Sequence, residues 1–387
     1  MGETYTVREV GSVGELHALR NEWRRIEDAQ PLPLPFFSWE WSIAWWAHFP
    51  ERGFRVRDRM FVHTVRDRAG ALVAVAPLMI TDRPGRGPVR TRFLQFFGAD
   101  PNVTETRGVA CMPEHDDGAH RALIDHLGRS RAWDWMLWGG LHADRGGARA
   151  VGEHATEWTG DVPCFYLELP PTWDELRSGL SRNIKESLRK CYNSLKRDGH
   201  EFTVDVARER DAIEPAVDHF LRLHRMRADV SGTITHRNVF DSGRAEAFLR
   251  DVCARFAERD ATRIVLLKIR GEVVACRIGF LLGKTLYLYY SGYDPAWGKY
   301  SVMTTTVAEA IKYAIGEKLS IVNLSTGSDV SKTRWSPKEI SFRSAVQVAP
   351  SLRGRLAYRV HRQAQELRND PRARAFIERF LGRARNA

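Results

Sequence analysis

The chain has 387 residues, a length that exceeds what one hydrophobic core usually organises and that favours two domains. Its hydrophobic share of 43% is enough to bury two cores. Its longest apolar runs, such as residues 74–80 and 264–267, fall far short of the ~20 residues that a membrane helix needs, so no transmembrane segment is expected. The formal net charge of +11 favours an anionic partner, without separating CoA phosphates from tRNA or anionic lipid.

The N-terminus has neither the basic head nor the apolar core of a signal peptide, so a cytoplasmic location is expected. Five cysteines are spread along the chain with no C-x-x-C pair and no matched histidines. This spacing argues against a disulfide framework and against a structural zinc site, and no metal is expected.

The first half contains apolar segments with strand and helix periodicity. In chain order they predict strands at Met60–Val65, Ala71–Ile80 and Arg92–Phe97, a helix around Asp117–Leu127 and a strand at Trp133–Trp138. Upstream, Phe36–Phe49 is dense in aromatic residues at helical spacing. We interpret it as part of the core, with a carbohydrate platform as the alternative.

The second half repeats this order of elements. The patterns predict an antiparallel meander, a helix and two more strands, at Arg263–Ile269, Val273–Leu281, Thr285–Ser291, 302–315, Ile321–Leu324 and Ile340–Val348. We interpret the recurrence as an internal duplication of one α/β unit, with chance recurrence of a common pattern as the alternative. The expected fold class is α/β with mixed α+β character.

The duplication suggests domain boundaries. A Gly-rich and polar stretch, Gly139–Asp161, precedes a fresh strand at Cys164, which predicts a first unit at 1–160 and a second at 161–350. The remainder, 351–387, has helical spacing interrupted at Asp370-Pro371, which predicts a basic tail of two short helices.

The passage from strand to helix at Tyr289–Val302 is the sharpest local feature. A helix that begins just after a buried strand presents free N–H groups and a positive dipole end, which suits a pyrophosphate. The residues expected to bind a cofactor there are Ser291, Gly298, Lys299, Tyr300, Ser301 and Val302. The alternative is an ordinary loop in which Ser301 is the N-cap, and neither a P-loop nor a Rossmann glycine pattern is present.

Several segments together resemble the BioF2-like, CelD-type acetyltransferase family of the GNAT superfamily, which is similar to the FemAB peptidyltransferases. The resemblance rests on residues 291–301, 332–335, 36–41 with Trp45-Trp46, and 181–185. It implies two tandem GNAT-like units, each a mostly antiparallel sheet flanked by helices, with acetyl-CoA or another acyl-CoA as donor and direct attack of an amine on the thioester. The sequence departs from the family where Val302-Met303 replace a Pro-Gly pair, and from the general GNAT pattern in lacking its Gly-rich donor loop.

Direct transfer needs a neutral amine and a base of suitable pKa. His224 is the first candidate, with a structural histidine as the alternative. Asp294, at the end of the meander, is the second, with an Asp-Pro turn as the alternative. Lys332, Arg334 and Trp335 follow a short strand and are expected to face the same cleft as substrate-binding residues, unless they form a solvated loop.

Basic residues also gather on one predicted helical face, at Arg182, Lys185, Arg189 and Lys196. Arg182 and Asn183 are expected to bind substrate. Such a face could bind a phosphate backbone, and in the FemAB relatives a basic surface serves an aminoacyl-tRNA donor; a solvated helix face is the alternative. In the first half, the acidic residues Glu114–Asp117 together with His120 suggest a metal site. The favoured alternative is that these acids lie at a helix N-terminus, where the helix dipole stabilises them.

Three functions follow as hypotheses. The first is an acyl-CoA-dependent N-acyltransferase that acts on an amine of a small molecule, sugar or natural product. The second is an aminoacyl-tRNA-dependent aminoacyltransferase of FemAB type. The third is a non-catalytic GNAT-like scaffold in envelope polysaccharide synthesis.

Overall fold

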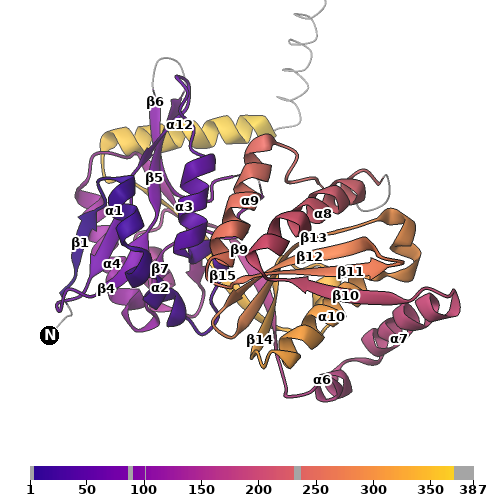
Figure 1. Ribbon diagram of the computed structural model, residues 1–387. Coiled ribbons are helices and arrows are strands. Elements are labelled where there is room, and N and C mark those ends of the chain that lie inside the picture. Colours follow the sequence, from indigo (N-terminus) through magenta and orange to yellow (C-terminus); the bar gives the residue numbers. More distant parts are fainter. Residues whose placement is uncertain (1–3, 86–89, 101, 231–236, 370–387) are drawn as a thin grey trace, which may run out of the picture.

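The computed structural model describes residues 4–85, 90–100, 102–230 and 237–369. Two lobes lie side by side, each with helices packed on sheet, and β9 and β15 run between them (Figure 1). The predicted fold class, α/β with mostly antiparallel sheets flanked by helices, is confirmed.

The first lobe contains the elements up to α5. Its strands are β1 (Thr6–Glu9), β2 (Arg57–Met60), β3 (His63–Arg66), β4 (Leu72–Ala76), β5 (Leu78–Pro84), β6 (Arg90–Phe96), β7 (Ala110–Cys111) and β8 (Trp135–His142). Its helices are α1 (Val13–Ala18), α2 (Arg20–Asp28), η1 (Pro35–Phe37), α3 (Trp39–His48), η2 (Pro113–His115), α4 (Asp116–Arg129) and α5 (Gly146–Gly152).

The second lobe follows β9 (Glu157–Glu168). Its strands are β10 (Phe202–Ala207), β11 (Thr262–Ile269), β12 (Glu272–Leu282), β13 (Thr285–Tyr293), β14 (Ile321–Thr326) and β15 (Lys338–Val348). Its helices are α6 (Trp173–Gly179), α7 (Arg182–Arg197), α8 (Arg210–Ala228), α9 (Gly243–Ala257), η3 (Pro295–Tyr300), α10 (Val302–Gly316) and α11 (Val330–Thr333). The last helix, α12 (Leu352–Asn369), returns to the first lobe, where it packs on β8 and β15 (Figure 1).

The predicted meander is present as β11, β12 and β13, which pair antiparallel in sequence order. Its first turn has Arg270 at φ 54° and Gly271 at φ 82°, the left-handed pair that a tight two-residue hairpin requires. Helices α8 and α9 pack on one face of this sheet, and α7 with α10 on the other. The second unit therefore follows its sequence periodicity closely.

The first unit differs from expectation at two strands. The segment Met60–Val65 and the segment Ala71–Ile80 each form two strands, and these belong to two different sheets. In the second segment Pro77 separates β4 from β5, because proline has no N–H to give to a ladder. The predicted single strands were wrong there.

The two units exchange a strand. The long sheet has the order β10-β11-β12-β13-β14-β9-β15-β8-β6-β5-β2. Strand β9 continues from the first unit but pairs with β14, whereas β15 ends the second unit but pairs with β8. The proposed boundary at 160/161 consequently lies within β9, and helix α5 occupies part of the Gly-rich stretch.

A single apolar cluster spans both lobes. The aromatic segment predicted to be core is buried, and helix α3 packs against α9. Trp41 meets Phe248 edge-on with ring centroids 5.2 Å apart, and Phe36 meets Tyr287 at 5.4 Å. At the C-terminus α12 forms one helix, and the second predicted tail helix lies outside the described residues.

Candidate active site

Strands β13 and β14 are parallel neighbours that part within the second unit. They pair only from Thr285 to Tyr287, against Ile321 to Asn323. Beyond Asn323 the register of β14 against β9 shifts, and Ser325 takes a left-handed φ of 76° with its N–H bonded to the Asn323 side chain at 2.8 Å. This irregularity opens the sheet at the carboxyl end of β13.

Helix α10 begins at that opening. Asp294 lies between the end of β13 and the start of η3. Its carboxylate accepts the N–H of Ala296 at 2.9 Å and so caps η3. Ser301 has φ 53° and ψ 42°, a strained conformation for a residue with a side chain, and α10 starts immediately after it. The first turn of α10 has no acidic residue, so the positive end of the helix dipole is not offset.

A cavity of about 260 Å³ lies in front of this helix end. Six of the residues predicted to bind donor or substrate line it: Ser291, Gly298, Ser301, Val302, Arg334 and Trp335. Arg227 and Arg277 line it too, and no aspartate or glutamate is among its described lining residues. Three guanidinium groups beside a helix N-terminus form a site for an anion.

The arginines are fixed by hydrogen bonds to the walls. Arg277 donates to the carbonyl of Leu288 at 3.2 Å, and Arg227 donates to the Ser291 hydroxyl at 3.0 Å. Burial lowers the pKa of Arg277 to about 10 and also lowers that of Arg227. Arg334 donates to the Ser187 hydroxyl, which ties the cavity to α7.

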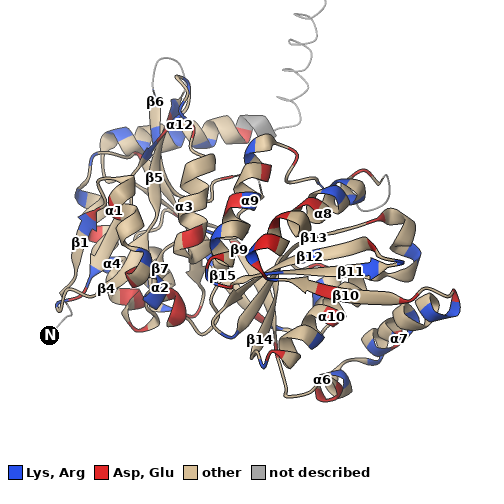
Figure 2. Ribbon diagram, viewed as in Figure 1, with Lys and Arg blue, Asp and Glu red and all other residues tan. Residues whose placement is uncertain are grey.

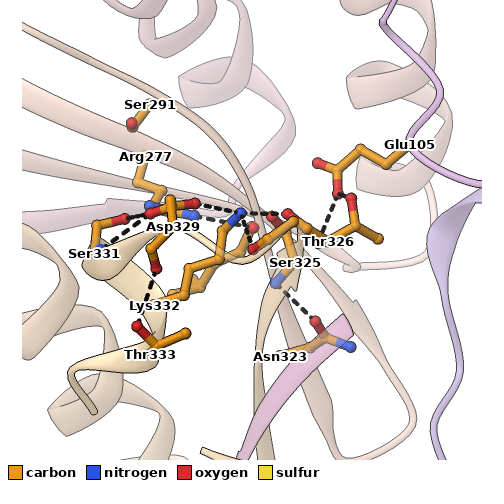
Figure 3. Close-up of polar contacts among 12 residues, drawn as sticks. Glu105, Arg277, Ser291, Asn323, Ser325, Thr326, Asp329, Ser331, Lys332 and Thr333 are labelled. Atoms are coloured by element: carbon orange, nitrogen blue, oxygen red, sulfur yellow. Dashed lines mark hydrogen bonds and ion pairs between the residues drawn. The ribbon is translucent and has the colours of Figure 1, made fainter. Parts of the chain in front are cut away.

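A carboxylate from the first unit reaches the point where β13 and β14 part (Figure 3). Glu105 lies on the loop after β6, and its Oε2 accepts the Tyr287 hydroxyl at 2.6 Å. The same oxygen accepts the backbone N–H of Thr326 at 3.1 Å and its hydroxyl at 2.9 Å. One carboxylate therefore bridges both strands from the side of the other unit.

The loop after β14 is held by Lys332, whose ammonium donates to the carbonyls of Thr326 and Gly327 and pairs with Asp329 at 2.8 Å (Figure 3). Burial raises the pKa of Asp329, but hydrogen bonds from Lys332 and Ser331 outweigh it and leave that pKa below its ordinary value. Lys332 thus shapes the loop, and it is not among the residues lining the cavity.

The two residues predicted to be catalytic lie outside the cavity lining. His224 is buried, stacks on Phe220 with ring centroids 5.2 Å apart, and donates from Nδ1 to the Ser291 carbonyl at 3.0 Å. Gly292 packs so closely against α8 that a Cβ at this position would lie 2.5 Å from the backbone nitrogen of His224. Asp294 caps η3 as described above.

Other predicted binding residues face a different side. Lys299 and Tyr300 line a small surface pocket against α7, where the Tyr300 hydroxyl donates to Asp198 at 3.0 Å. Arg182 and Asn183 are exposed at the start of α7, and Arg182 pairs with Glu186 at 2.8 Å. Lys and Arg residues recur along α7 and appear as blue segments of that helix in Figure 2. These residues are not part of the arginine cavity.

Arg277, Arg227 and Glu105 were absent from the sequence-based candidates. Arg277 is a lone charge inside the apolar run Val273–Leu281, and a charge in a buried strand is unusual enough to indicate a function. Arg227 lies three residues after the candidate His224, so both lie on the same side of one helix. Glu105 lies in a polar loop of the first unit, and no local pattern links it to the second.

Among the described residues, one group of three could hold a metal ion: Cys111, Asp116 and His120, whose ligand atoms lie within 4.8 Å of one another. Asp116 is the first residue of α4, and His120 lies one turn later on the same helix. The Asp116 carboxylate accepts the N–H of Gly147 at 2.6 Å. The predicted acids at a helix N-terminus are therefore present.

Residues 182–333 match the family model described as Acetyltransferase (GNAT) domain. The matched segment includes α7 to α11 and the opening between β13 and β14, and it contains every lining residue of the arginine cavity except Arg334 and Trp335. The second unit carries a GNAT acetyltransferase domain, and the predicted enzyme class, an acyltransferase, is confirmed. No curated protein matches the chain.

Two solved structures share the fold over most of the chain. A crystal structure of FemX is 10% identical with a TM-score of 0.56, over 87% of this chain and 96% of that one. The C-terminal domain (DUF2156) of an Agrobacterium fabrum protein named for lysylphosphatidylglycerol synthesis is 10% identical with a TM-score of 0.51, over 86% and 92%. A tandem GNAT protein from the clavulanic acid biosynthesis pathway is 11% identical, with a TM-score of 0.45 over 90% and 100%.

Within the part of the chain that the structure describes, no helix combines the length and the apolar character needed to cross a membrane.

Proposed function

We propose that the chain transfers an acyl group from an acyl-CoA to a primary amine of a small molecule, sugar or natural product. One observation carries the proposal: the cavity at the start of α10 has three guanidinium groups and no carboxylate among its described lining residues. Phosphates at a helix N-terminus with arginines are favourably bound, so the anionic end of CoA suits this cavity.

In this proposal the acyl thioester lies where β13 and β14 part. The amine nitrogen attacks the thioester carbon, the new C–N bond forms, the C–S bond breaks, and the sulfur leaves as the CoA thiolate. The amine proton passes to a base, and the thiolate takes a proton to become the free thiol. Ser291, Ser301, Val302 and Arg334 are the residues proposed to hold the donor.

Glu105 is proposed as the group that receives the amine proton, or holds the incoming ammonium before it loses that proton. Its carboxylate is at the opening and is supplied by the other unit, on the side away from α10. His224 is proposed as a positioning residue, because it donates a hydrogen bond to the carbonyl of Ser291, which lines the cavity, while His224 itself does not line it. Asp294 is proposed to fix the connection that leads into α10.

An assay of free thiol release tests the proposal. Purified protein is given acetyl-CoA and longer acyl-CoAs with a panel of amino sugars, amino acids and diamines, and acylated products are identified by mass spectrometry. The expected result is amine-dependent thiol release with at least one pair. Absence of turnover with every acyl-CoA, together with absence of acyl-CoA binding, would contradict it.

The exposed basic face of α7 favours a second candidate, transfer from an aminoacyl-tRNA. A charged tRNA mixture offered in the same assay separates the two. Aminoacyl transfer without acyl-CoA turnover would favour the tRNA donor. Binding without any transfer would favour the third hypothesis, a GNAT-like scaffold.

A further inference from the structure

A second cavity, of about 320 Å³, lies between the first unit and the strands that the units share. It is bounded by the end of α2, the segment that follows it, the start of α4 and the end of β8. Ile26, Leu34, Ile340 and Phe342 give it apolar walls. It shares no lining residue with the arginine cavity, so it is a separate site of a size that suits a small molecule.

A buried carboxylate forms part of its floor. Asp116 is 9% exposed, and its Oδ2 accepts the N–H of Gly147. Gly147 must be glycine for this approach, since a Cβ there would lie 2.8 Å from that oxygen. The Nδ1 of His120 lies 3.5 Å from the Asp116 Oδ1, and no described lysine or arginine pairs with this carboxylate. A buried carboxylate without a cationic partner is costly.

His120 adds a hydrogen-bond acceptor beside it. The ring is 4% exposed, and its Nδ1 donates to the backbone carbonyl of Asp116 at 2.7 Å. That bond places the proton on Nδ1, so the neutral ring carries its lone pair on Nε2. No described residue is hydrogen-bonded to this nitrogen, which leaves it for a ligand that donates.

One guanidinium lines the same cavity. Arg145 donates to the side-chain oxygen of Gln30 at 2.9 Å, and no described carboxylate lies within ion-pair distance of it. The Cys111 sulfur, which lines the same cavity, lies within 4.8 Å of the ligand atoms of Asp116 and His120. The cavity is thus lined by a carboxylate with no lysine or arginine partner and by a guanidinium with no carboxylate partner among the described residues.

The other lining carboxylates are already neutralised. Glu27 pairs with Arg259 at 2.7 Å, and Glu168 pairs with Lys338 at 2.6 Å. A phosphate is disfavoured here, because the first turn of α4 contains Asp116 and Asp117, which offset the helix dipole. The start of α10 has no such acids. The duplicated units therefore differ in the charge that their helix starts accept.

We propose that this cavity binds an α-amino acid with an apolar side chain. Its carboxylate would pair with Arg145, its ammonium with Asp116 and the Nε2 of His120, and its side chain would lie against the apolar walls. Each unpaired charge then gains a partner, which a neutral ligand or a simple amine would not provide. The proposal does not depend on the acyl-transfer reaction.

Calorimetry on the full-length protein, with EDTA present, tests the site with three matched probes: L-phenylalanine, phenethylamine and 3-phenylpropionate. L-phenylalanine is expected to bind, and each analogue, lacking one charge, at least about tenfold more weakly. No binding of L-phenylalanine or L-leucine at millimolar concentration would overturn the proposal. Equal binding of phenethylamine and L-phenylalanine would overturn it too.

Variants locate the binding. Arg145→Gln is expected to weaken L-phenylalanine binding at least about tenfold. The matched control is Arg149→Gln, on helix α5 directly after Arg145 but exposed and outside the cavity, which should leave binding unchanged. Asp116→Asn is likewise expected to weaken L-phenylalanine binding, whereas Asp117→Asn, outside the cavity lining, should leave it unchanged. Unchanged affinity in Arg145→Gln would overturn the assignment, even if Asp116→Asn fails to fold. Acetyl-CoA binding to Arg145→Gln, measured alongside, separates this result from failure of the donor site.

Discussion

At the scale of single residues, Glu105 joins the two units where β13 and β14 part. It accepts hydrogen bonds from Tyr287 on β13 and Thr326 on β14, although it belongs to a loop of the first unit. Three donors on one oxygen hold the carboxylate at a fixed position, which a base or an ammonium-holding group needs. Its place could not be predicted, because the contact joins residues 182 and 221 positions apart in sequence.

Glu105→Gln should lower kcat by about a hundredfold and leave the Kd for acyl-CoA unchanged, because the amide keeps the size of the side chain but cannot take a proton. Steady-state kinetics and calorimetry measure the two quantities. Glu114→Gln, exposed in the same unit, serves as the control. Wild-type kcat in Glu105→Gln would remove this residue from the chemistry.

His63 gives the fold a defined acid sensitivity. It is fully buried in β3, and burial lowers its pKa from the ordinary 6.5 to about 4. Because the unfolded chain binds the proton at higher pH than the folded protein does, stability falls as pH drops below 6.5 and levels off near 4. The loss attributable to His63 should be about 3 kcal/mol across this window. Denaturation of wild type and His63→Gln at several pH values tests it, and an identical pH dependence in both would contradict it.

At the scale of elements, periodicity predicted the second unit better than the first. Strands β11, β12 and β13 and helix α10 lie close to the expected bounds, because each has a strong pattern and short turns. The division of Ala71–Ile80 between two sheets was missed, since apolar periodicity does not show which sheet a strand joins. Four residues predicted on the β13–α10 connection line the arginine cavity, namely Ser291, Gly298, Ser301 and Val302. The other two, Lys299 and Tyr300, line the pocket against α7 instead.

The packing of α8 on β13 is tested at Gly292. Gly292→Ala should destabilise the protein by about 1–3 kcal/mol, because the added Cβ would meet backbone atoms of Leu223 and His224 at 2.7 and 2.5 Å. Gly298→Ala, whose nearest atom would be 3.6 Å away, is the matched control. Urea denaturation gives both values, and equal stabilities would show that α8 can shift without cost.

At the scale of the whole molecule, strand exchange makes the two units one structure. Strand β15 lies between β8 and β9, and one apolar cluster contains residues of both lobes. This exchange explains why a boundary drawn from sequence at 160/161 lies within a paired strand. The recurring order of elements was visible in the sequence, but the exchange was not, because both arrangements have the same periodicity.

Calorimetric unfolding of the full chain should show one cooperative transition, because neither unit keeps a complete sheet without the other. Fragments 1–169 and 170–387 should be insoluble when expressed apart and recovered as a complex when expressed together. Two separate transitions, or a folded fragment 1–169 alone, would contradict the exchange.

The central claim is that the cavity at the start of α10 holds the donor. Calorimetry with acetyl-CoA on the wild type, Arg334→Gln and Arg189→Gln tests it most directly, since Arg334 lines the cavity and Arg189 is exposed on α7. The account expects binding by the wild type and by Arg189→Gln, with at least about tenfold weaker binding by Arg334→Gln. Full affinity in Arg334→Gln with loss in Arg189→Gln would place the donor on α7 and contradict the account.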